Sequence, residues 1–249
     1  MLKTSFLCFT LFLFVTSSVS AELRFTMRTE TRKTKSSEPP DPFFTKFGEM
    51  FATAVAPGGR AETVFIVGDE RVRVELGAAI GGLPAGTVIL RQADGSTFIL
   101  NPTDRTYRKT TLETRTNGLA AADVSSKRTG EFATIAGVRA ERVTLAATFD
   151  FSKAPQPAPG FPTKVTLDWQ LWVADRFKMP PSMMAVMNPA IQLLGLQKYI
   201  QDGLVMRQIL RSPLLGGYEL ESRIVEFSER PVPPQLFEVP GDYTLRSSQ

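Results

Sequence analysis

The stretch VTLDWQLWV, residues 165–173, alternates apolar and polar side chains along most of its length. Successive side chains of a β-strand point to opposite faces of the sheet, so this alternation predicts a strand with one buried face. Trp169 falls on the apolar parity and Trp172 on the other. We therefore expect one indole inside the protein and the other at a rim or beneath a helix. The inward-facing residues of this predicted strand are Val165, Leu167, Trp169, Leu171 and Val173.

The same period of two recurs through most of the chain, for example at Leu23–Met27 and Tyr218–Phe227. Gly68-Asp69, Asp94-Gly95 and Ala136-Gly137 separate such runs and predict tight hairpin turns, with Gly68 first in a type II′ turn. Counting the runs gives about nine or ten strands joined mainly by short turns, which is typical of a meandering antiparallel sheet or barrel. The fold is therefore expected to be mainly β.

Two segments change from a strand period to a helical period. Phe43–Val55 has apolar residues at helical spacing after Asp41, a candidate N-cap, and Pro42, which suits a first helical position. Pro180–Gln197 is the second, with an interruption at Asn188-Pro189. Both segments are rich in Phe or Met.

The first 21 residues resemble an export signal. Lys3 supplies the positive charge, Phe6–Val15 the apolar core, and Val19–Ala21 the small residues before a cleavage site. The apolar run is too short to span a bilayer, so we expect cleavage before Glu22 and no stable membrane anchor afterwards. The only cysteine, Cys8, lies inside this signal, so the mature chain forms no disulfide, and a bacterial periplasm is the expected location of a soluble protein.

Composition excludes several chemistries for residues 22–249, which we expect to form a single domain. The chain has no histidine, and the mature part has no cysteine, so Ser-His-Asp or Cys-His catalysis and an ordinary zinc site are not expected. The net charge of +4 is small and spread out, which argues against nucleic-acid binding. We expect no enzyme activity and no cofactor, although 25 acidic residues leave a carboxylate-only hydrolase open.

The Phe- and Met-rich segments allow two interpretations. They could complete the core by covering one face of the sheet, or they could be mobile lids over an apolar cavity. Phe and Met suit an adaptable binding surface, because the unbranched thioether repacks around different ligands with little strain. Under the second interpretation the candidate ligand-binding residues are Phe43, Phe47, Met50, Phe51, Trp169, Leu171, Met183, Met184, Met187 and Ile191.

Several short motifs occur together in the order seen in a known family. They are Ile135-Ala136-Gly137 with Arg139–Val143, Leu171-Trp172-Val173-Ala174, Gly203–Arg207, and the ending Leu236–Tyr243. Over about Ala61 to Tyr243 the chain resembles periplasmic proteins with the outer-membrane lipoprotein carrier fold, the LolA/LolB-like proteins. It departs from the true carriers in lacking a helix directly after the signal and in carrying extra Pro-rich loops at Ser36–Pro42 and Lys153–Pro162.

The resemblance implies a strongly curved antiparallel sheet that forms an incomplete barrel, with its concave face covered by short helices. Characterised members bind acyl chains of lipoproteins or other lipids, or act as envelope-stress sensors. The implied lids here are Phe43–Val55 and Met183–Leu196. The resemblance therefore implies a monomeric periplasmic binding or carrier protein for an apolar ligand. The alternative is an envelope interaction or stress-sensing protein that engages a protein partner.

Overall fold

The structure is a computed structural model that describes residues 22–34, 42–68, 70–111, 123–150, 163–178 and 203–246. Strands dominate these residues. The elements are β1 (Leu23–Lys33), α1 (Pro42–Val55), η1 (Pro57–Gly59), β2 (Arg60–Gly68), β3 (Arg71–Leu76), β4 (Val88–Arg91), β5 (Ser96–Asn101), β6 (Thr106–Thr111), β7 (Asp123–Ile135), β8 (Val138–Asp150), β9 (Lys164–Ala174), β10 (Leu204–Arg211), η4 (Pro213–Leu215), β11 (Tyr218–Glu229), η5 (Pro234–Phe237) and β12 (Thr244–Leu245).

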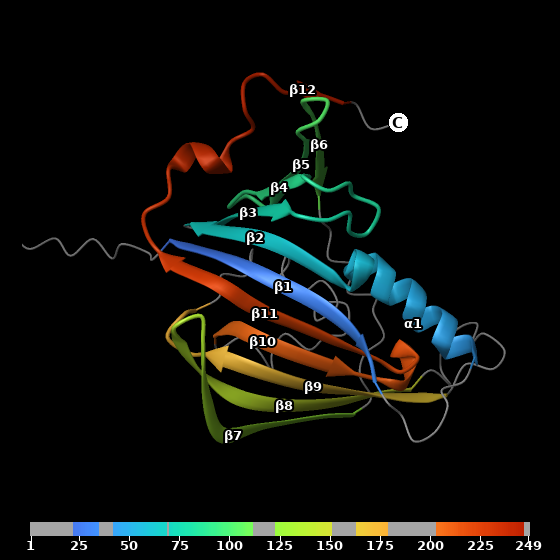
Figure 1. Cartoon of the computed structure of the whole chain (residues 1–249). Helices are drawn as coiled ribbons and strands as arrows, with labels where there is room; N and C mark the ends of the chain where they lie inside the picture. Colours follow the sequence, from blue (N-terminus) through green and yellow to red (C-terminus); the bar gives the residue numbers. More distant parts are fainter. Residues whose placement is uncertain are drawn as a thin grey trace, which may run out of the picture.

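All the strands belong to one 12-stranded sheet with the order β12-β6-β5-β4-β3-β2-β1-β11-β10-β9-β8-β7. Neighbouring strands are antiparallel, except that β12 runs parallel to β6. Figure 1 shows β1 and β11 in the middle, with β4–β6 on one side and β7–β9 on the other. The sheet is open, because its last strands on either side, β12 and β7, are not paired with each other. The prediction of a mainly β, open antiparallel sheet is confirmed.

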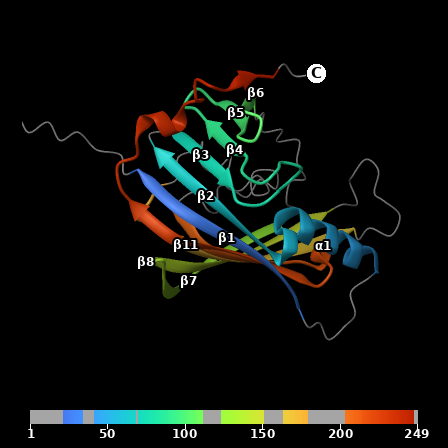
Figure 2. The same cartoon turned by 45° about the horizontal axis from the view of Figure 1, so that its top comes forward.

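Irregular pairing bends this sheet at three places. The β1–β11 register shifts between Thr26 and Met27, the β10–β9 register between Val205 and Arg207, and the β7–β8 register between Arg128 and Phe132. Such bulges bend a strand and increase its local twist. Figure 2 shows the β2–β6 part of the sheet inclined to the β7–β9 part.

Helix α1 begins at Pro42, as the sequence predicts, and lies at the end of the sheet where β1 ends and β2 begins (Figures 1 and 2). It contacts η1, η4 and the strand β11. The approach to η4 is close, because a side chain at Gly48 would overlap the carbonyl oxygen of Leu215, and one at Gly216 would overlap that of Phe44. The second predicted helical segment, Pro180–Gln197, lies outside the described residues. Within the described part of the chain, no helix has the length and apolar character needed to cross a bilayer.

The predicted hairpins are present, with one correction at the first. Gly68 pairs with Arg71 and is still part of β2, so it is not the first residue of the turn, and Glu70 has φ 56°. Gly68 is small for a packing reason, since an added Cβ would lie 3.0 Å from the ring of Phe237. At Ala136-Gly137 both residues have positive φ, as a type I′ turn requires. The polar connection predicted at Leu112–Ser126 is shorter than expected, because β7 already begins at Asp123.

Two large apolar clusters stabilise the sheet. The first joins β1–β3 to β11 and to the hairpin ends of β8–β10, with the rings of Phe25 and Phe65 stacked at 5.1 Å. The second consists of one face of β8, β9 and β10. Its buried members are Val143, Leu145, Ala147, Phe149, Val165, Leu167, Trp169, Leu171, Val173 and Val205, and we call this surface the apolar face.

Candidate functional site

The apolar face contains the two predicted site residues that belong to strand β9. Trp169 pairs with Leu145 of β8 and Leu210 of β10, and Leu171 pairs with Val143 and Gln208. Directly paired residues point to the same side of a sheet, so all of these side chains share one face. Trp169 is 5 % exposed and Leu171 is fully buried. The predicted inward parity of residues 165–173 is therefore confirmed.

The described residues provide no second layer of secondary structure over the apolar face. In the described part of the chain, three partly buried residues pack against it: Val124 of β7, Leu210 of β10 and Leu214 of η4. Helix α1 contacts η4 but contributes no residue to this cluster. A sheet face this apolar is stable only when another apolar surface covers it.

Two residues bring polar atoms into the apolar face. One is Trp169, a predicted site residue, and the other is Gln208, which was not predicted. Gln208, 9 % exposed, lies opposite Ser222 on β11. The hydroxyl of Ser222 is 3.0 Å from that of Thr29, so these two satisfy each other. By contrast, Nε1 of Trp169 and Oε1 of Gln208 are buried without a hydrogen-bond partner in the described part of the chain. Alternation did not identify Gln208, because the irregularity between Val205 and Arg207 changes which side its side chain faces.

The predicted site residues on α1 are not gathered with Trp169 and Leu171. Phe47 is 38 % exposed, Met50 is 64 % exposed and Phe51 is half-buried. Phe43 lies in the first turn of α1, but its side chain is outside the described set. Four further predicted residues also lie outside the described residues: Met183, Met184, Met187 and Ile191.

The opposite face of the same strands is charged. Trp172 projects there, with the guanidinium groups of Arg207 and Arg142 at 4.6 Å and 5.9 Å from its ring. Arg207 also pairs with Glu221 at 2.9 Å. Arg32 binds Glu30 at 2.6 Å, and this hydrogen bond holds the pKa of Glu30 below its ordinary value. The two tryptophans therefore lie on opposite faces, as predicted. Trp169 belongs to the apolar face, whereas Trp172 packs, partly buried, against the first apolar cluster and lies beside two guanidinium groups.

A pocket of about 490 Å³ opens on this charged face between β1, β2, β3 and β11. Arg28 and Arg60 both bind Glu62, and hydrogen bonds from Arg60 first and Arg28 second lower the pKa of Glu62. Arg73 binds Glu75 at 2.7 Å. A carboxyl whose pKa is lowered, as that of Glu62 is, stays ionised and is a poor proton donor. A smaller pocket of about 180 Å³ lies at β5 and β6, and neither pocket includes a predicted site residue.

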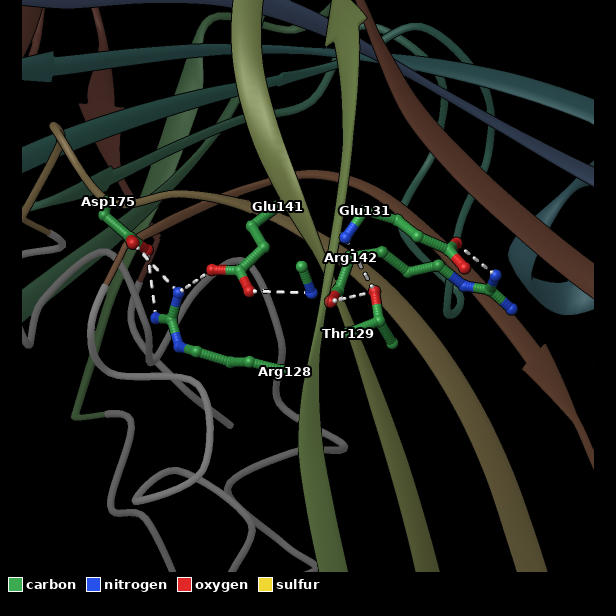
Figure 3. Close-up of polar contacts among 7 residues, drawn as sticks. Arg128, Thr129, Glu131, Glu141, Arg142 and Asp175 are labelled. Carbon is green, nitrogen blue, oxygen red and sulfur yellow. Dashed lines mark hydrogen bonds and ion pairs between the residues drawn. The ribbon is translucent and has the colours of Figure 1, made fainter.

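A second charged cluster is located where β7 bulges away from β8 (Figure 3). Arg128 donates to Asp175 and Glu141, at 2.9 Å and 2.6 Å. These hydrogen bonds, the ones to Asp175 first, raise the pKa of Arg128. Thr129 donates to the carbonyl oxygen of Arg142 at 3.0 Å and accepts from the backbone N–H of Glu131. These contacts fix the backbone of the bulge. No group of acidic residues able to hold a metal ion occurs among the described residues.

Comparison with known proteins gives structural similarity only. No family model matches the chain, and no curated protein matches it. Among solved structures, it is similar to the lipoprotein LppX of Mycobacterium tuberculosis, with 12 % identity, a TM-score of 0.36, and coverage of 84 % of this chain and 88 % of that one. It is also similar to a LolA superfamily protein of Nitrosomonas europaea, with 11 % identity, a TM-score of 0.34, and coverage of 88 % and 90 %.

Proposed function

We propose that this chain is an exported periplasmic binding or carrier protein for an apolar ligand, a lipid or an acyl chain. The observation that supports this most is the apolar face of β8–β10. Ten apolar side chains of three neighbouring strands form one continuous surface there. An apolar ligand held between this face and the predicted lids is a covering of the required chemistry.

The energetics allow such a ligand to bind without strong polar contacts. Each buried methylene contributes about 0.8 kcal/mol, so an acyl chain of ten carbons contributes about 8 kcal/mol. Ordering the ligand and the segments around it opposes this gain. Several additional methylenes compensate for that cost, which favours long acyl chains over small hydrocarbons.

The residues divide into a floor and lids. Trp169 and Leu171 supply the floor, because both are buried on the apolar face. Phe43, Phe47, Met50 and Phe51 of α1, together with Met183, Met184, Met187 and Ile191, are proposed to contact the ligand from the lids. Exposed Phe47 and Met50 fit this role, since large apolar side chains in contact with water gain by covering a ligand.

Extraction of the purified protein tests this function. The protein is isolated from a bacterial periplasm without detergent, extracted with organic solvent, and the extract is analysed by mass spectrometry. We expect about one acyl-containing molecule per chain. Leu171→Glu, which places a carboxylate on the floor, should lose that molecule, whereas Trp172→Phe on the opposite face should retain it. Lipid-free wild-type protein that also fails to take up an added fatty acid would falsify the proposal.

Strand β7 favours a second candidate function, engagement of an envelope protein. It is the last strand of the sheet, runs for 13 residues, and carries Phe132, which is 52 % exposed. Unpaired edges of this kind can accept an added strand. Cross-linking in the periplasm from residues of β7 tests it: a stoichiometric protein partner on lipid-free protein favours this function over lipid binding.

A further inference from the structure

The apolar face contains one buried hydrogen-bond donor and one buried acceptor that lack partners among the described residues. They are Nε1 of Trp169 and Oε1 of Gln208. Both residues are more than nine-tenths buried, at 5 % and 9 % exposed. Buried polar atoms nearly always have a partner, because losing water without replacing it costs stability. An orphaned pair therefore needs an explanation.

The strand register brings these two residues together. Trp169 lies opposite Leu210 and Gln208 lies opposite Leu171, so Trp169 and Gln208 are diagonal neighbours on the same face of β9 and β10. Diagonal neighbours are about 7–8 Å apart, a distance that long side chains can bridge with a small group between them.

Nearby polar groups do not satisfy the pair. Ser222, opposite Gln208, is bonded to Thr29 instead. The residues directly paired with Trp169 are Leu145 and Leu210, which offer no polar side-chain atom. The donor and the acceptor are thus enclosed in an otherwise apolar surface.

We infer that Trp169 and Gln208 bind the polar linkage of the ligand, the point where its acyl chain joins the head group. The indole N–H donates to a carbonyl oxygen, and Oε1 of Gln208 accepts from an adjacent N–H or O–H. This inference presupposes the apolar-ligand function proposed above. It narrows the ligand to acyl amides or hydroxy-esters, which carry both groups, and disfavours plain hydrocarbons and ethers.

Three amphiphiles with the same alkyl chain and head group test this assignment. One is linked through a secondary amide, with a carbonyl and an N–H; one through an ester, with a carbonyl only; and one through an ether, with neither. We expect the wild type to bind the amide about five-fold more tightly than the ester, and the ester about five-fold more tightly than the ether. Isothermal titration with detergent-free protein measures all three affinities.

Two variants test which residue causes each of the two differences in affinity. Gln208→Met, nearly the same shape, should remove the preference for amide over ester. Trp169→Phe should remove the preference for ester over ether. The readout is the ratio of affinities within each variant, because a changed side chain in the binding surface also alters the affinity for the ether. Trp172→Phe, on the opposite face, is the matched control and should change none of the ratios.

The outcomes separate the two claims. If the wild type binds all three amphiphiles with equal affinity, the polar linkage site is wrong while the apolar-ligand function stands. If the wild type binds none of them, the function itself is contradicted. The wild-type series alone decides both points, so the test does not depend on either variant folding.

Discussion

Gln208 and Ser222 face each other across β10 and β11, but their hydrogen bonding differs. The hydroxyl of Ser222 is bonded to that of Thr29, whereas Oε1 of Gln208 has no partner in the described structure. Losing a satisfied buried bond costs stability, whereas removing an unsatisfied polar atom relieves a penalty. The two residues therefore should respond in opposite ways to apolar substitution.

We predict that Ser222→Ala lowers the free energy of unfolding of ligand-free protein by about 1 kcal/mol, because it breaks the bond to Thr29. Gln208→Met should leave that free energy unchanged or raise it. Urea unfolding monitored by circular dichroism measures both. A loss of 1 kcal/mol or more in Gln208→Met would show that Gln208 is satisfied in the free protein.

The lowered pKa of Asp94, at the β4–β5 turn, predicts that the stability of the protein depends on pH. Its carboxylate accepts hydrogen bonds from the backbone N–H and the hydroxyl of Ser96, at 2.8 Å and 2.9 Å, and the backbone bond is the larger cause of its lowered pKa. A carboxyl with a lowered folded pKa stabilises the protein above its unfolded pKa, about 3.9, and loses this contribution as the pH falls through the folded value.

We therefore expect Asp94→Ala to melt below the wild type at pH 7, with the difference in Tm shrinking as the pH falls below about 4. Thermal unfolding across pH 2–7 measures it, with Asp104→Ala, at a neighbouring turn, as the control. A difference in Tm that is independent of pH would contradict a role for the ionised carboxylate.

At the scale of elements, α1 is positioned by small residues. A Cβ at Gly48 would overlap backbone atoms of Leu215, which cannot move aside as a flexible side chain can. Helix propensity alone predicts that Gly→Ala stabilises a helix by about 0.8–1 kcal/mol. The contact with η4 reverses that expectation.

We predict that Gly48→Ala lowers the free energy of unfolding by about 1–3 kcal/mol, the usual cost of overpacking. Thr53→Ala, at an exposed position of the same helix, serves as the control and should have little effect. Chemical denaturation measures both variants. Stabilisation by Gly48→Ala would mean that α1 does not dock on η4 as described.

Hydrogen bonds of Thr129 fix the bulge in β7. Thr129 holds it through Arg142 and Glu131, so β7 offers a regular edge to an added strand only on either side of the bulge. We predict that Thr129→Val lowers stability by about 1 kcal/mol and increases self-association at high concentration. Sedimentation velocity compares it with Thr144→Val, a half-buried threonine of β8. Equal self-association of the two variants would contradict a role for Thr129 in protecting the edge of β7.

Local patterns predicted most of these elements, and the exceptions have physical causes. Alternation predicted β9 because this strand has one buried face, and Pro42 marked the start of α1. The first turn is displaced by one residue because Gly68 accommodates the ring of Phe237, a contact 169 residues away that no local pattern contains. Strand β12 has only two residues, too few to show any period.

Only part of the candidate site could be predicted, because the rest depends on contacts between residues that are distant in sequence. Trp169 and Leu171 follow from the parity of one strand, but Gln208 depends on a bulge and on the order of the strands. That order places β1 between β2 and β11, which joins segments from opposite ends of the chain. Strand order depends on contacts distant in sequence, so it had to come from the structure.

For the whole molecule, the central claim is that an acyl chain lies against the apolar face and not against the charged one. The two tryptophans report on these faces separately, because Trp169 is on one and Trp172 on the other, and the chain has no others. Trp172→Phe leaves Trp169 as the sole tryptophan, and Trp169→Phe leaves Trp172.

The most direct measurement is quenching of each single-tryptophan variant by a fatty acid brominated along its chain, since bromine quenches indoles only at close range. The unbrominated fatty acid is the control. We predict saturable quenching of Trp169 and none of Trp172. Equal quenching of both indoles, or an unquenched Trp169 under conditions where the fatty acid binds, would contradict the placement of the ligand on the apolar face.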